Sequence, residues 1–91
     1  MRVLFVERES PPERLVCEAE IHFEEGALAG TRLVGFSLWR SPEGEIFVTF
    51  PSRALERRFF DYLRAVDGDA ETVKRVKGWI HDEYWKLKAA A

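Results

Sequence analysis

The sequence contains few of the residues that make disulfides, metal sites or membrane spans. Its one cysteine, Cys17, has no partner for an internal disulfide and no neighbouring ligands for a zinc knuckle. No stretch approaches the roughly 18 apolar residues of a membrane span, and the acidic Glu7 comes too early for a secretion signal. We therefore expect a cytoplasmic protein, stabilised by packing and self-association, with no membrane contact and no cofactor.

Residues suited to catalysis are equally sparse. The chain has no glycine-rich phosphate loop and no spacing typical of a Ser/His/Asp triad. His22 shares a strand face with Glu20 and Glu24, which would suit a metal, but a solvated polar face is the simpler interpretation. Cys17 alternates with apolar residues and is expected in the core. We therefore predict no catalytic residues, no metal site and no enzymatic activity.

The apolar content is sufficient for one small domain. The 91 residues are 46% hydrophobic and 33% charged, which is typical of a globular chain. The patterns predict an N-terminal strand and proline-containing loop over 1–14, an antiparallel sheet over 15–66 and a helix over 69–88. The predicted fold class is α+β: a small antiparallel sheet of hairpins with the C-terminal helix packed on one face, assembled as a dimer.

The strands are predicted from alternation and from turn residues. A short strand over 3–7 precedes a strand over 15–23 in which apolar and polar residues alternate. Two further strands are predicted over 31–40 and 45–50. Between them, Ser41-Pro42-Glu43-Gly44 favours a type I turn, so we expect a hairpin with a four-residue loop.

This loop length predicts one register for the hairpin. Arg40 is placed opposite Glu45, and Trp39 opposite Ile46. One sheet face is then apolar through Val34, Phe36, Leu38 and Phe47, and the other through Leu33, Trp39, Ile46, Val48 and Phe50. Because one helix cannot cover two apolar faces, we expect a homodimer.

The C-terminal helix has the clearest periodicity. Asp69 is the predicted N-cap of a helix over 70–88. Its apolar stripe is spaced by three and four residues and consists of Val73, Val76, Ile80, Tyr84 and Leu87. The segment between Pro51 and Val66 fits both a helix capped by Ser52 and an edge strand, and the pattern favours the helix.

A second stripe of this helix is basic and aromatic. It consists of Lys74, Lys77, His81, Trp85 and Lys88, with Gly78 beside it. Cations displace counterions from a nucleic-acid backbone, and an exposed aromatic ring stacks on an unpaired base. An ordinary solvated lysine face is the alternative. Arg53, Arg57 and Arg58 either enlarge this patch or pair with nearby acids.

Charge is distributed unevenly along the chain. Residues 1–50 contain 5 Lys or Arg against 9 Asp or Glu, whereas residues 51–91 contain 9 against 7. The net charge is −2, so any attraction to nucleic acid must come from a local basic surface.

The order of the motifs resembles the SpoVG family of bacterial septation regulators over about residues 15–88. A glycine-turn hairpin leads through the Phe/Val-rich stretch Ile46–Phe50 into Pro51-Ser52-Arg53, which matches the family's Pro-Ser-Lys/Arg signature. The closing helix matches an Asn/Asp-Glu-Tyr-x-x-Leu pattern at Glu83, Tyr84 and Leu87. The segment 54–63 differs, because the family's polar loop and His-Pro pair are missing.

The resemblance implies a non-enzymatic homodimer that binds DNA and RNA through basic residues of its helical end. It also implies an edge strand over 59–66, which we adopt in place of the helix. We expect phosphate contacts from Arg53, Lys74, Arg75, Lys77, Lys86 and Lys88, and base stacking by His81 or Trp85. The alternative function is a protein-interaction module that uses the acidic first half and the uncovered sheet face.

Overall fold

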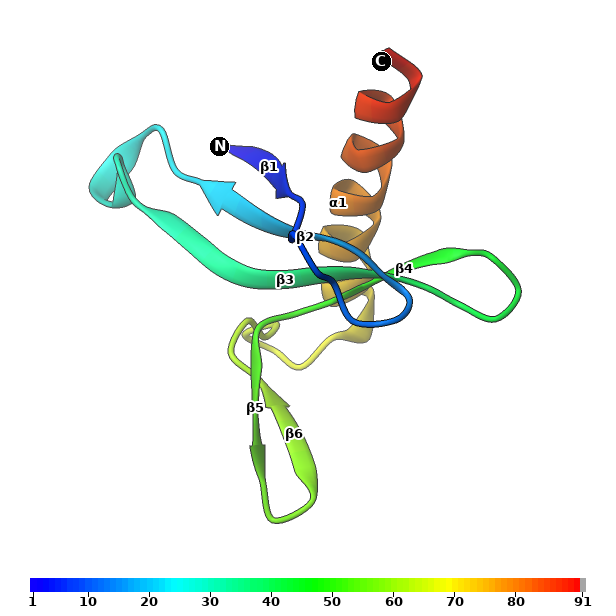
Figure 1. Cartoon of the computed structure of the whole chain (residues 1–91). Coiled ribbons are helices and arrows are strands. Elements are labelled where there is room, and N and C mark those ends of the chain that lie inside the picture. The colour runs from blue at the N-terminus through cyan, green and yellow to red at the C-terminus, as the bar shows by residue number, and fades with distance from the viewer. Residues whose placement is uncertain (91) are drawn as a thin grey trace.

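The computed structural model describes residues 1–90 as a four-stranded sheet, a separate hairpin and one long helix (Figure 1). The elements are β1 (Arg2–Val6), β2 (Leu15–His22), a 3-10 helix (Gly26–Leu28), β3 (Arg32–Arg40), β4 (Ile46–Thr49), β5 (Ser52–Leu55), β6 (Arg58–Asp61) and α1 (Ala70–Ala90). Strands β1 to β4 are antiparallel neighbours in sequence order. The predicted α+β class, with the helix on one sheet face, is confirmed.

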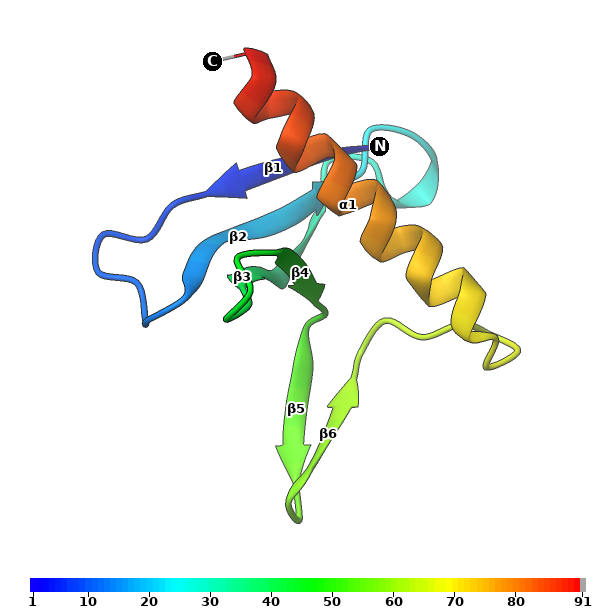
Figure 2. The same cartoon turned by 90° about the vertical axis from the view of Figure 1, so that its right-hand side faces the viewer.

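Helix α1 begins at the predicted N-cap and crosses one face of the sheet (Figure 2). The Asp69 carboxylate accepts a hydrogen bond from the backbone N–H of Glu71 at 3.0 Å, which satisfies one free donor of the first turn. Ile80 and Tyr84 are buried against the sheet. Leu87 was predicted on the same stripe but is 53% exposed, because it lies in the last turns, which rise beyond the strands (Figure 1).

The core lies between α1 and the sheet. The predicted alternation of β2 is confirmed, and its buried side chains are Leu15, Cys17, Ala19 and Ile21. Phe36 and Leu38 of β3 are completely buried in the same layer. Phe5 of β1 packs edge-on against the Tyr84 ring, with centroids 5.5 Å apart. β1 is therefore part of the main sheet, which starts before the predicted residue 15.

The predicted register of the β3–β4 hairpin is wrong by one residue. The predicted turn is present, because the Gly44 N–H donates to the Ser41 carbonyl at 2.9 Å, and it is type I rather than type II because Glu43 has a negative φ. Gly44 has φ +89°, however, and the Ser41 N–H donates to the Glu45 carbonyl at 2.7 Å. A type I turn followed by a left-handed residue forms a bulge that adds one residue to the loop. Arg40 therefore lies opposite Ile46, and the predicted Arg40–Glu45 pairing is replaced by a bond from Arg40 to the Gly44 carbonyl at 3.2 Å.

A slip of one residue exchanges the two faces of a strand. On the side that faces α1, β3 and the residues after it contribute the buried side chains Phe36, Leu38, Ile46, Val48 and Phe50. Trp39 and Phe47 lie opposite each other on the other side. We call that side the open face, which consists of Glu18, Glu20, Ser37, Trp39, Phe47 and Thr49. The predicted division of apolar residues between two faces was therefore wrong, although aromatic residues do remain on the uncovered side.

Strands β5 and β6 form a hairpin that projects away from the sheet (Figures 1 and 2). We call residues 52–61 the arm. The predicted helix in this segment is wrong, and the predicted edge strand over 59–66 is present only as far as Asp61 and pairs with β5 rather than with the main sheet. The loop residues Glu56 and Arg57 have φ +49° and +72°. Asn-Gly is the usual sequence for such a turn, so nothing in the Glu-Arg pair indicated it.

Candidate nucleic-acid interface

The predicted aromatic and basic row is present along one side of α1. A spacing of four residues places His81 and Trp85 on adjacent turns, and the Trp85 Nε1–H donates to His81 Nε2 at 3.2 Å. The Trp85 ring also packs edge-on against Tyr84, with centroids 5.4 Å apart. Trp85 nevertheless remains 47% exposed. The structure therefore holds a solvent-facing indole in a defined orientation, which is what base stacking requires.

The two most exposed lysines of the helix contact acids of the same helix. Lys74 lies 3.4 Å from Glu71, and Lys86 lies 3.4 Å from Glu83. Exposed pairs of this kind contribute at most about 1 kcal/mol and are weakened by salt. Both ammonium groups are therefore free to exchange these partners for a phosphate.

Two lysines of the row, Lys77 and Lys88, lie over aromatic rings. The Lys77 Nζ is 5.2 Å from the Phe50 ring centroid, and the Lys88 Nζ is 5.6 Å from that of Tyr84. Lys88 is also 3.9 Å from Glu7 of the loop after β1. These contacts hold Lys77 at the β4 edge of the sheet and Lys88 at the opposite, β1 edge.

The predicted site residues Lys86, Arg75 and Arg53 are not in this row, and Lys86 and Arg75 are each turned by about 100° from a neighbouring member of it. Arg75 is exposed on α1, one residue beyond Lys74. Arg53 lies on β5 in the arm, where Arg57 and Arg58 are also exposed. Across the described residues 1–90, none of these three arginines forms an ion pair, so the predicted alternative of pairing with nearby acids is not realised. The structure thus divides the predicted patch into a helix row and a separate basic arm.

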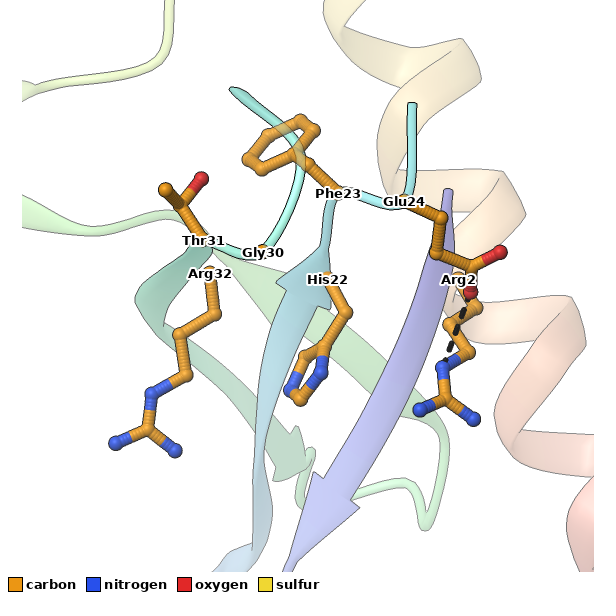
Figure 3. A pocket seen from close by; sticks show the side chains of 7 residues that line it. All are labelled: Arg2, His22, Phe23, Glu24, Gly30, Thr31 and Arg32. Atoms are coloured by element: carbon orange, nitrogen blue, oxygen red, sulfur yellow. Dashed lines mark ion pairs between the residues drawn. The ribbon is translucent and has the colours of Figure 1, made fainter. Parts of the chain in front are cut away.

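A hollow of about 400 Å³ lies where β2 ends and β3 begins (Figure 3). Its polar lining side chains are Arg2, His22, Glu24, Thr31 and Arg32. The Arg2 guanidinium contacts the Glu24 carboxylate at 3.1 Å. Arg2 is thus neutralised by Glu24, and Arg32 is neutralised by Glu20 beside the hollow, so neither arginine is left without an acidic partner.

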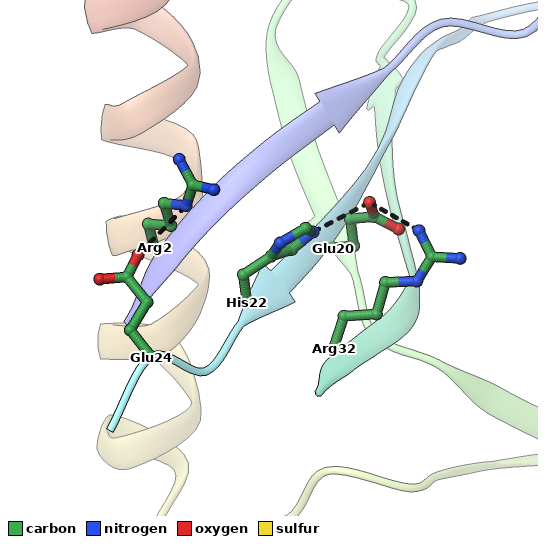
Figure 4. A network of polar contacts seen from close by, with 5 residues as sticks. All are labelled: Arg2, Glu20, His22, Glu24 and Arg32. Atoms are coloured by element: carbon green, nitrogen blue, oxygen red, sulfur yellow. Dashed lines mark hydrogen bonds and ion pairs between the residues drawn. The ribbon is translucent and has the colours of Figure 1, made fainter. Parts of the chain in front are cut away.

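A polar network beside this hollow engages His22, which shares a strand face with Glu20 in the sequence pattern. The Glu20 carboxylate contacts His22 Nε2 at 3.0 Å and Arg32 Nη1 at 3.3 Å (Figure 4). The hydrogen bond from His22, followed by the charge of Arg32, holds the pKa of Glu20 below its ordinary value. Glu24 is engaged by Arg2 instead. Within residues 1–90, no three His, Cys, Asp or Glu side chains converge as metal ligands.

Cys17 lies in the core, as its alternation predicted, and is only 3% exposed. Burial raises the pKa of its thiol to about 11. We expect the thiol to react with iodoacetamide at pH 8 at least about 100-fold more slowly in the folded protein than in urea, because the reactive thiolate is scarce and shielded. Labelling followed by mass spectrometry measures both rates. Equal rates with and without urea would contradict the buried position.

The fold and the site together define an α+β protein with a helix-covered antiparallel meander, a basic row around an exposed tryptophan and a protruding arm. No helix within residues 1–90 is both long enough and apolar enough to cross a membrane. No family model matches the chain, and neither the curated proteins nor the solved structures contain a significant match.

Proposed function

We propose that the protein is a non-catalytic, cytoplasmic regulator that binds DNA or RNA as a homodimer through the helix row of α1. The observation that carries the proposal is the half-exposed Trp85 ring, oriented by His81 and flanked along the helix by lysines. The order of the motifs, which resembles the SpoVG family, supports the same function. Phosphates would be contacted by Lys74, Arg75, Lys77, Lys86 and Lys88, with Trp85 or His81 stacking on a base.

Charge reversal in the row should remove nucleic-acid binding. We expect Lys74→Glu/Lys77→Glu to weaken binding of labelled oligonucleotides more than tenfold and to lower the salt slope by about two, because two phosphate contacts are lost. Fluorescence anisotropy at low and moderate salt measures both effects. Arg2→Glu/Arg40→Glu changes net charge equally at sites outside α1 and should bind nearly as the unmodified protein does. No binding by the unmodified protein at low salt would refute the proposed function.

A protein-interaction module is the second candidate, and the open face favours it. Phe47 is 48% exposed there, beside the half-buried Trp39. An apolar association of this kind would not weaken as salt rises, whereas binding to phosphates would. The salt titration therefore separates the two functions.

A further inference from the structure

The chain exposes more surface than its mass requires. Its accessible surface is 7004 Å², whereas a compact monomer of 10.6 kDa exposes about 5,500 Å². Its radius of gyration is 13.9 Å, against about 12 Å expected for a compact chain of this length. The excess of about 1,500 Å² is larger than the roughly 800 Å² that one partner buries in a standard interface. The fold therefore has the surface for one complete protein–protein contact.

Aromatic side chains from the arm and the open face line a groove of about 540 Å³. Trp39 and Phe47 of the sheet lie along it together with Phe59 and Asp61 of the arm. Phe59 is 78% exposed. Because a two-stranded hairpin alone is at best marginally stable in water, the arm requires a surface to pack against.

The arm turns its basic side away from its own sheet. Arg53 pairs across the hairpin with Phe60, and Arg58 pairs with Leu55, so these four side chains share one side. The side that lines the groove instead carries Phe59 and Asp61. The basic side therefore contacts nothing in its own chain that neutralises Arg53 or Arg58 within the described residues.

The open face presents one exchangeable carboxylate. Glu18 lies opposite Ser37, which lines the groove, and its contact with Arg8 at 3.4 Å is an exposed ion pair that another arginine can replace. Glu20, on the same side of β2, is held by His22 and Arg32. The arm has three arginines against one glutamate between residues 52 and 58. A basic and apolar arm thus matches an apolar sheet face that carries Glu18, but the arm turns its basic side away from its own sheet.

We propose that two copies of the chain form a dimer about a two-fold axis, with the arm of each lying in the groove of its partner. We call this dimer the clasp. The Arg53 and Arg58 side of each arm packs on the partner's open face near Glu18, and the Phe59 sides of the two arms meet each other. Both unpartnered surfaces belong to one chain, so a single two-fold axis satisfies both at once. This inference rests on the homodimer of the proposed function and assigns its surface. It does not depend on nucleic acid.

Sedimentation velocity without nucleic acid tests the clasp. We expect the unmodified protein to sediment as a dimer, and Phe47→Glu and Phe59→Glu each to weaken dimerisation more than tenfold. Circular dichroism should be unchanged, because both side chains are largely exposed in the single chain. Leu87→Glu is the matched control, since Leu87 is 53% exposed on α1, and it should remain dimeric.

An exchange of charges tests which surfaces meet. Arg53→Glu/Arg58→Glu places acids against Glu18, and Glu18→Lys places a cation against the arginines, so each variant alone should be mainly monomeric. A mixture restores attraction at both contacts of a heterodimer, and we expect it to sediment as a dimer. Failure of the mixture to associate, a monomeric unmodified protein, or unchanged mass for Phe59→Glu would each overturn the clasp. If the unmodified protein is a dimer but binds no oligonucleotide, the result would count against the proposed nucleic-acid function and not against the clasp.

Discussion

Replacing Ile80 by alanine should lower the free energy of unfolding by about 2–5 kcal/mol, the range for large-to-small changes in a core. Ile80 is completely buried and belongs to the core cluster between α1 and the sheet. The loss is a large fraction of the roughly 5–15 kcal/mol that stabilises an average domain. Urea unfolding followed by tryptophan fluorescence measures it.

Leu87→Ala is the control for this change, because Leu87 belongs to the same predicted stripe but is 53% exposed. It should cost less than about 1 kcal/mol. If both variants lost the same stability, the position of the helix on the sheet would be wrong.

Replacing Gly35 by alanine should cost about 2–4 kcal/mol, although the change adds only one methyl group. Gly35 has φ +104°, a conformation that alanine avoids, and lies at an irregularity in the β2–β3 pairing. A Cβ atom there would approach the Cβ of the buried Pro51 to 2.9 Å. Thermal and urea unfolding of the variant provide the measurement.

Gly78→Ala is the matched control for Gly35. A Cβ at Gly78 meets no atom within 4 Å, and the residue is helical. The substitution should therefore raise stability by up to about 1 kcal/mol through helix propensity. Destabilisation by both substitutions would contradict the specific contact between Gly35 and Pro51.

The arm could not be predicted from local sequence patterns. Its strands are only four residues long, and its turn uses Glu56 and Arg57, which do not favour positive φ. Alternation in so short a segment fits a helix nearly as well as a strand. The basic side of the arm followed from cross-strand pairs that become visible only once the turn is known.

The helix row was largely predictable, because all of its members are on one helix and their spacing determines their side. The separation of Arg53 from that row was not, since it depends on the direction in which the chain leaves β4 (Figure 2). The groove between the arm and the open face depends on the same direction.

The sequence by itself determined the α+β class, the helix with its Asp69 cap, the buried side of β2 and the core position of Cys17. These features follow from periodicity and capping within one element, which are local properties. Only the tertiary structure decided the register of β3 with β4 and the projection of the arm. A bulge at Gly44 moves the side chains of β4 to the face opposite the predicted one. The physical reason is that this shift depends on the backbone dihedral angles of the turn, which periodicity within one strand does not determine.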